Sequence, residues 1–130
     1  MSTTRDWDDL AALIEAVDSH LDANTSATYQ AQPLAQDWAR VAKVTEEAGE
    51  AVDALIGLTG QNPRKGVYGD LDHLLDELAD VALATVYAIQ HFTKDAGKTL
   101  DRIFTRSEVH RGRLAAAAPT VEHPATPPPS

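Results

Sequence analysis

The chain has 130 residues, 43% of them hydrophobic and 24% charged, which fits one globular domain with a modest core. It has no cysteine, and this excludes disulfides, thiolate metal sites and cysteine nucleophiles. The 20 acidic residues outnumber the 11 lysines and arginines, and the formal net charge of −9 argues against binding to long nucleic acids, which need a basic surface.

No apolar run has the length of a membrane span, and the first six residues lack the apolar stretch of a signal peptide. We therefore expect a cytoplasmic protein without a membrane partner. The chain is also short enough to be compatible with assembly with copies of itself.

Two helices are expected in the first half of the chain. Apolar residues recur at helical spacing from Asp6 to about Leu21. A polar connection follows over residues 23–32, and a second helix is expected from Pro33 to about Leu58, ending near Gly57 or Gly60. Its predicted core stripe consists of Val41, Val44, Thr45, Ala48, Val52 and Leu55.

Two further helices are expected after a loop over residues 61–69. Asp70 is a suitable N-cap for a third helix that reaches about Lys94. From Leu78 to Ile89 this helix is apolar or small almost all round, which is typical of a helix buried on most sides in a bundle or between subunits. Gly97 interrupts the pattern, and a fourth, basic helix is expected from Lys98 to about Leu114.

The predicted fold class is therefore all-α, a four-helix bundle in one domain over residues 1–114. The remaining residues, 115–130, are rich in alanine, proline and threonine without periodicity, so we expect a disordered tail.

Two pairs of carboxylates have a spacing of three residues, Glu47 with Glu50 and Glu77 with Asp80. Each pair shares one face of its helix. Alone, the first pair and the adjacent Glu46 are typical of a solvated helix face. The second pair lies in an apolar helix, where carboxylates are costly unless paired or metal-bound, and no lysine or arginine lies within one turn of it. We therefore expect both pairs to converge on Mg²⁺, or on Mn²⁺ in its place, together with substrate phosphates.

Two residues of the second helix leave alternatives open. Lys43 lies one turn before Glu47, so a structural ion pair is the alternative to a metal site there. Trp38 lies about two and a half turns before Glu47 and is a candidate for stacking on a base, although a position in the core or an interface is more typical of such a tryptophan.

The acidic motifs resemble those of a known enzyme family. Glu46-Glu47-Ala48-Gly49-Glu50, followed after 26 residues by Glu77-Leu78-Ala79-Asp80, is similar to the E-E-x-x-E…E-x-x-D signature of the MazG-like nucleoside triphosphate pyrophosphohydrolases. The resemblance covers about residues 33–113 and includes Lys43 and the apolar run over residues 81–89.

The resemblance implies an all-α MazG-like fold that oligomerises through its helices, as a homodimer or homotetramer. It also implies Mg²⁺-dependent cleavage of an NTP or dNTP to a monophosphate and pyrophosphate. By motif position the metal ligands would be Glu47, Glu50, Glu77 and Asp80. Glu47 and the neighbouring Glu46 would be the catalytic carboxylates.

Members of this family also carry a basic segment, K-x-x-x-N-R-x-R, after the last core helix. Arg106, His110, Arg111 and Arg113 fall on that pattern, with arginine in place of the lysine and histidine in place of the asparagine. The resemblance implies that they bind substrate phosphates, and Lys43 and Trp38 complete the predicted substrate-binding residues. The alternative for the basic residues is a favourable interaction with the dipole at a helix C-terminus.

Two other functions compete with this prediction. Phosphoribosyl-ATP pyrophosphohydrolase, a related helical family with similar acidic motifs, is the enzymatic alternative. The alternative from another class is a non-catalytic helical module that binds metal, nucleotide or a partner protein.

Overall fold

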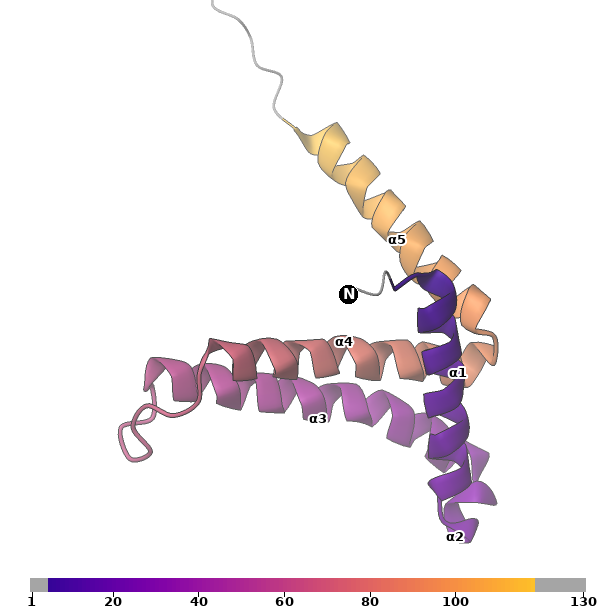
Figure 1. The fold of residues 1–130 in the computed structure, drawn as a ribbon, viewed down its shortest axis with the longest axis horizontal. Helices are drawn as coiled ribbons and strands as arrows, with labels where there is room; N and C mark the ends of the chain where they lie inside the picture. The colour runs from indigo at the N-terminus through magenta and orange to yellow at the C-terminus, as the bar shows by residue number, and fades with distance from the viewer. Residues whose placement is uncertain (1–4, 119–130) are drawn as a thin grey trace, which may run out of the picture. The chain divides into compact units, whose positions relative to one another are not determined.

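The computed structural model describes residues 5–118, and this part of the chain consists of helices and connections without a strand (Figure 1). Five helices lie in this range: α1 Trp7–Asn24, α2 Ala27–Gln30, α3 Pro33–Thr59, α4 Leu71–Thr93 and α5 Ala96–Ala117. The prediction of an all-α fold is confirmed, and α2 is an additional short helix within the predicted connection. No helix of the described range has the length and apolar character needed to cross a membrane.

The helix starts follow the expected capping chemistry. Asp6 begins α1 with a capping box, in which its side chain accepts from the backbone N–H groups of Asp8 and Asp9. Asp70 begins α4 by accepting from the backbone N–H of His73 at 2.9 Å. Pro33 occupies the first position of α3, where its missing N–H costs nothing.

The helix ends differ from the prediction at one point. Gly60 ends α3 in the left-handed conformation, as expected, with φ of 67°. The break before the last helix lies at Lys94, with φ of 54°, and Gly97 lies inside α5. The reason is that the Asp95 carboxylate accepts from the backbone N–H of Lys98, which caps α5 before the glycine is reached.

The chain forms two compact units that meet in sequence after Leu100. The first contains α1 to α4 and the first residues of α5, and in the second α5 continues to Ala117, three residues beyond the predicted end of the fourth helix. The tail predicted from residue 115 lies outside the described residues from residue 119 onward. The domain boundary at residue 114 stays a prediction.

The first unit is built on the antiparallel pair α3 and α4, with α1 packed on α4 (Figure 1). The two long helices approach closely because their facing side chains are small: Ala51 and Ala54 on α3 and Ala84 and Ala88 on α4 are buried. This pairing sets the carboxylates of α3 opposite those of α4.

The predicted core stripe of α3 is wrong within this chain. Val41, Val52 and Leu55 are 48%, 58% and 45% exposed, and of the six predicted residues only Val44 is partly buried. Within the single chain α4 is not buried on most sides, since Leu78 is 50% exposed, and its burial between subunits stays a prediction. The physical reason is that the helices meet through their small residues, so the larger apolar residues lie on a neighbouring face.

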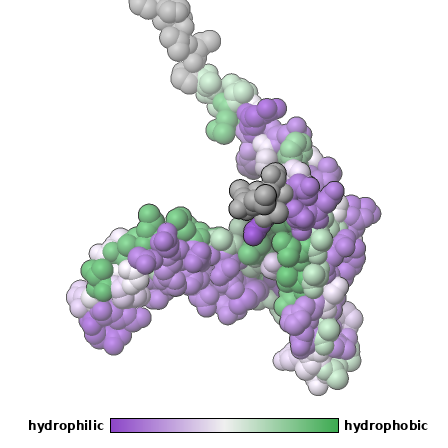
Figure 2. All heavy atoms as spheres, viewed as in Figure 1, coloured by the Kyte–Doolittle hydropathy of each residue, from purple (hydrophilic) through white to green (hydrophobic). Residues whose placement is uncertain are grey.

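The residues of that neighbouring face are regularly spaced, and we call this face the apolar seam. Its residues alternate in steps of three and four along each helix: Leu34, Trp38, Val41, Thr45, Ala48, Val52 and Leu55 on α3, and Leu71, Leu75, Leu78, Ala82, Thr85, Ile89 and Phe92 on α4. All except Ile89 are exposed. Figure 2 shows apolar residues gathered along one edge of the α3–α4 pair.

Candidate metal centre and adjoining cavity

The pairing of α3 with α4 brings three of the four predicted metal ligands together. Glu47, Glu77 and Asp80 each offer a carboxylate oxygen, and these oxygens lie within 4.8 Å of one another. The side chains of Glu47 and Glu77 are only 12% and 18% exposed. Three carboxylates so close together repel one another, and a hard divalent cation with oxygen ligands removes that cost. This set of donors therefore fits Mg²⁺.

Glu50, the fourth predicted ligand, lies beside this group without joining it. Hydrogen bonding with Glu47 raises the pKa of Glu50, and the negative charges of Glu47 and Glu77 act in the same direction. Glu50 is therefore close enough to feel the negative charge of the cluster.

Lys43 supplies the ion pair that the sequence left open as an alternative. Its ammonium lies 2.7 Å from a carboxylate oxygen of Glu47 and 3.1 Å from one of Glu46. This contact lowers the pKa of Glu47 and raises the pKa of the Lys43 ammonium. The ion pair and the carboxylate cluster therefore coexist, with Glu47 belonging to both.

His73 is a neighbour of the cluster that sequence reasoning missed. Its Nδ1 lies 3.6 Å from a carboxylate oxygen of Glu77, one turn later on α4. The signal was the spacing of four residues between His73 and Glu77, which places both on one helix face.

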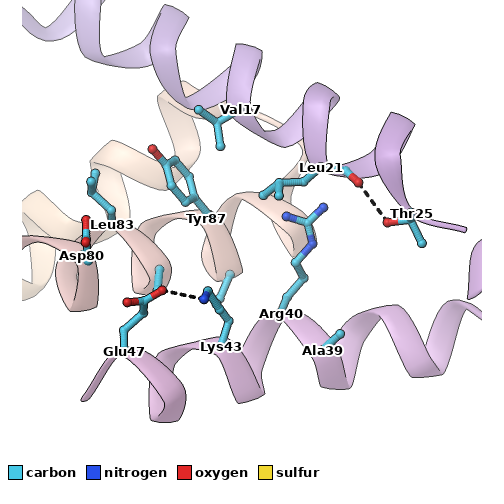
Figure 3. A pocket seen from close by; sticks show the side chains of 12 residues that line it. Val17, Leu21, Thr25, Ala39, Arg40, Lys43, Glu47, Asp80, Leu83 and Tyr87 are labelled. Carbon is cyan, nitrogen blue, oxygen red and sulfur yellow. Dashed lines mark hydrogen bonds and ion pairs between the residues drawn. The ribbon is translucent and has the colours of Figure 1, made fainter. Parts of the chain in front are cut away.

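A cavity of about 600 Å³ adjoins the cluster and lies between α1, α3 and α4. It is lined by Val17, Leu21, Thr25, Ala39, Arg40, Lys43, Glu47, Asp80, Leu83, Ala84, Tyr87 and Ala88. Figure 3 shows Glu47 and Asp80 toward one end, Arg40 and Thr25 toward the other, and Tyr87 between them. Two of the three carboxylates of the cluster, Glu47 and Asp80, therefore line a cavity large enough for a small organic molecule.

Ion pairs hold α1 in place as one wall of this cavity. Arg40 on α3 donates to Asp22 on α1 at 2.9 Å, and the Lys94 ammonium lies 3.2 Å from both Asp18 and Asp22. Burial tends to raise the pKa of Asp22, but the hydrogen bonds and charges of Lys94 and Arg40 outweigh it, so the pKa is lowered. Sequence reasoning missed this network because its partners are 18 to 76 residues apart and no local spacing indicates them.

The other predicted substrate-binding residues, and the predicted catalytic residue Glu46, are exposed on their helices. Trp38 is 69% exposed on the apolar seam and does not line the cavity. The side chain of Glu46 is 58% exposed. The basic residues are all exposed on α5 in the second unit: Arg106, His110, Arg111 and Arg113. Their roles stay predictions.

The helical fold and the convergence of the two acidic motifs define an all-α NTP pyrophosphatase of the MazG-like superfamily. Within this superfamily the chain belongs to the phosphoribosyl-ATP pyrophosphohydrolase family, whose model matches residues 10–111. The match begins in α1, so it extends further toward the N-terminus than the motif resemblance. Comparison with curated proteins and with solved structures gave no match.

The family assignment sets the general activity. Its members are pyrophosphohydrolases, which act on an acid-anhydride bond and generally depend on a divalent metal. The predicted resemblance and enzyme class are thereby confirmed, and the chain is a nucleotide pyrophosphohydrolase in this general sense.

Proposed function

We propose that this chain is a Mg²⁺-dependent pyrophosphohydrolase that converts an NTP or dNTP and water into a nucleoside monophosphate and pyrophosphate. The observation that supports it most directly is the convergence of Glu47, Glu77 and Asp80 beside a cavity of about 600 Å³. The bond cleaved is the anhydride between the α and β phosphates.

The converging carboxylates would hold the cation, with Glu50 beside them as the fourth acidic group. When bound, Mg²⁺ offsets the charge of the triphosphate oxygens and lowers the pKa of a water molecule. The hydrogen bond with Lys43 lowers the pKa of Glu47 and so favours its ionised form, which is the form that binds a cation.

Two neighbours of the cluster have roles in the proposed reaction. Glu46 is the candidate for accepting the proton of the attacking water, because it lies next to Glu47 and its carboxylate is accessible. The Lys43 ammonium, held between Glu46 and Glu47, donates to a phosphate oxygen when substrate arrives. The arginines of α5 are proposed to balance the charge of the leaving pyrophosphate.

Phosphoribosyl-ATP is the second candidate substrate, and the family match favours it. It presents the same triphosphate to the same carboxylates, so the chemistry at the metal centre would be unchanged. The two proposals differ only in what the protein must accommodate beyond the triphosphate.

We also propose that the chain forms a homodimer through the apolar seam. The seam lies along two antiparallel helices with steps of three and four residues, the pattern by which helices pack in bundles. Nine of its large side chains are at least 45% exposed and together present on the order of 1,000 Å², about what one partner contributes to a standard interface. A second copy would bury these residues in a four-helix arrangement, and a homotetramer would need a further surface.

The test is incubation with each common ribonucleotide and deoxynucleotide and with phosphoribosyl-ATP, with Mg²⁺ or with EDTA. The expected products are the monophosphate and pyrophosphate, formed only with metal. Release of orthophosphate would contradict the proposal. A nucleotide that raises the Tm in the presence of Mg²⁺ but is never cleaved would indicate a binding module instead.

A further inference from the structure

The cavity beside the carboxylate cluster has two chemically different ends. Glu47 and Asp80 make one end acidic, with Leu83 beside Asp80, while Val17 and Leu21 contribute apolar surface further along (Figure 3). When cations hold the triphosphate of a nucleotide at the acidic end, its uncharged sugar and base can enter the apolar part of the cavity.

We propose, building on the proposed function, that this cavity is the site for the nucleotide base, with Tyr87 as its stacking partner and Arg40 as a hydrogen-bond donor to it. This assigns binding roles to two residues outside the acidic motifs. It also gives α1, which contributes Val17 and Leu21, a part in substrate binding.

Tyr87 is suited to stacking by its position and its chemistry. It is the aromatic residue among those that line the cavity, it is partly buried, and it lies between the acidic end and Arg40 (Figure 3). An aromatic ring offers every base a flat apolar face, and such stacking contributes about 1–3 kcal/mol per base. Trp38, the aromatic residue suggested by the sequence, lies on the apolar seam instead.

Arg40 is suited to contact an uncharged acceptor. One of its terminal nitrogens donates to Asp22 at 2.9 Å, while the other, Nη1, is buried without a partner among the described residues. A buried donor without an acceptor is unfavourable, so an acceptor on a bound ligand would remove that cost. Because Asp22 offsets the guanidinium charge, a carbonyl oxygen or ring nitrogen suits this end better than a second phosphate.

The test compares an NTP with ribose 5-triphosphate, which carries the same phosphates without a base. The readout is the ratio of kcat/KM for the NTP to kcat/KM for the base-free substrate. Tyr87→Leu is expected to lower this ratio roughly tenfold, because stacking affects only the NTP. Tyr29→Leu, at an exposed tyrosine of α2 outside the cavity, is the matched control and is expected to leave the ratio unchanged.

Arg40→Gln is expected to lower the same ratio severalfold. Asp22→Asn is its structural control, because it breaks the same ion pair and keeps the guanidinium. An equal fall in both variants would overturn the role of Arg40 in base binding. An equal effect of Tyr87→Leu on both substrates would overturn the stacking role of Tyr87.

One measurement on the unaltered protein does not depend on the folding of any variant. Nuclear Overhauser contacts between the base protons of a bound nucleoside monophosphate and the ring protons of Tyr87 are expected, and their absence at saturation would overturn the base site. These outcomes are distinct from failure of the proposed function, which would appear as no cleavage of either substrate by the wild type.

Discussion

The Lys43 ammonium lies 2.7 Å from the same Glu47 side chain that meets Glu77 and Asp80 across the α3–α4 contact. Glu47 is thus shared between a lysine of its own helix and carboxylates of the next one. In the absence of a divalent cation Lys43 is the group that offsets its charge. A divalent cation and the Lys43 ammonium therefore compete for the Glu47 carboxylate.

Replacing Lys43 is expected to lower the thermal stability of the metal-free protein and to increase the stabilisation that Mg²⁺ gives. Lys43→Gln removes the charge that stabilises ionised Glu47, so the Tm without metal should fall by roughly 2 °C. The rise in Tm on adding Mg²⁺ should exceed that of the wild type, because no ammonium competes. Thermal unfolding with and without Mg²⁺ measures both, and Lys98→Gln at an exposed lysine of α5 is the control. An unchanged response to Mg²⁺ would show that Lys43 and the cation do not share Glu47.

Glu50 is expected to affect stability in opposite directions with and without metal. Its pKa is raised in the folded state, so its protonation stabilises the fold below the ordinary value of 4.5, and this contribution is lost as the pH rises through the folded value. Glu50→Gln should therefore raise the Tm of the metal-free protein at pH 7 by a few degrees and should reduce the gain from Mg²⁺. Glu15→Gln, at an exposed glutamate of α1, is the control. A lower Tm for Glu50→Gln without metal would contradict the repulsion inferred here.

Asp22 is expected to stabilise the attachment of α1 above acidic pH. Its pKa is lowered by Lys94 and Arg40, so its contribution is present above the ordinary value of 3.8 and is lost as the pH falls through the folded value. Because the Asp22 side chain is 43% exposed, Asp22→Asn should cost only about 1 kcal/mol at pH 7, and the difference from the wild type should vanish near pH 2. Urea unfolding at the two pH values measures this, and an equal loss at both would rule out the charge of Asp22 as the cause.

The apolar seam is expected to be the dimer interface. Leu75→Glu places a charge on the α4 part of the seam, where Leu75 is 52% exposed in the single chain, and should shift the protein to monomers. Leu13→Glu, at a leucine of α1 that is 57% exposed and lies outside the seam, should leave the oligomer intact. Light scattering after size-exclusion chromatography gives the mass of each variant and so distinguishes a monomer from a dimer. A wild-type monomer at micromolar concentration would contradict the proposed dimer.

The sequence predicts the helix boundaries well because they depend on local chemistry. Asp6 and Asp70 cap their helices, Pro33 begins α3 and Gly60 ends it, and each effect acts within one turn. The predicted start of α5 was wrong because Asp95 caps the helix two residues before Gly97, the glycine that the sequence indicated as the break.

The packing is less predictable from sequence because helical periodicity shows an apolar face without showing what covers it. Val52 and Leu55 have the spacing of core residues, yet within the chain α3 meets α4 through Ala51 and Ala54. The convergence of Glu47 with Glu77 was predicted from the paired motifs, whereas the Asp22–Arg40 ion pair has no local signal.

The most direct test of the carboxylate cluster is a titration with Mn²⁺ followed by electron paramagnetic resonance. We expect the wild type to bind Mn²⁺, Glu77→Gln to weaken that binding at least tenfold, and Asp76→Asn, at the adjacent exposed carboxylate, to leave it unchanged. Equal affinity for Mn²⁺ in the wild type and in Glu77→Gln would contradict the claim that the α3 and α4 carboxylates together hold the cation.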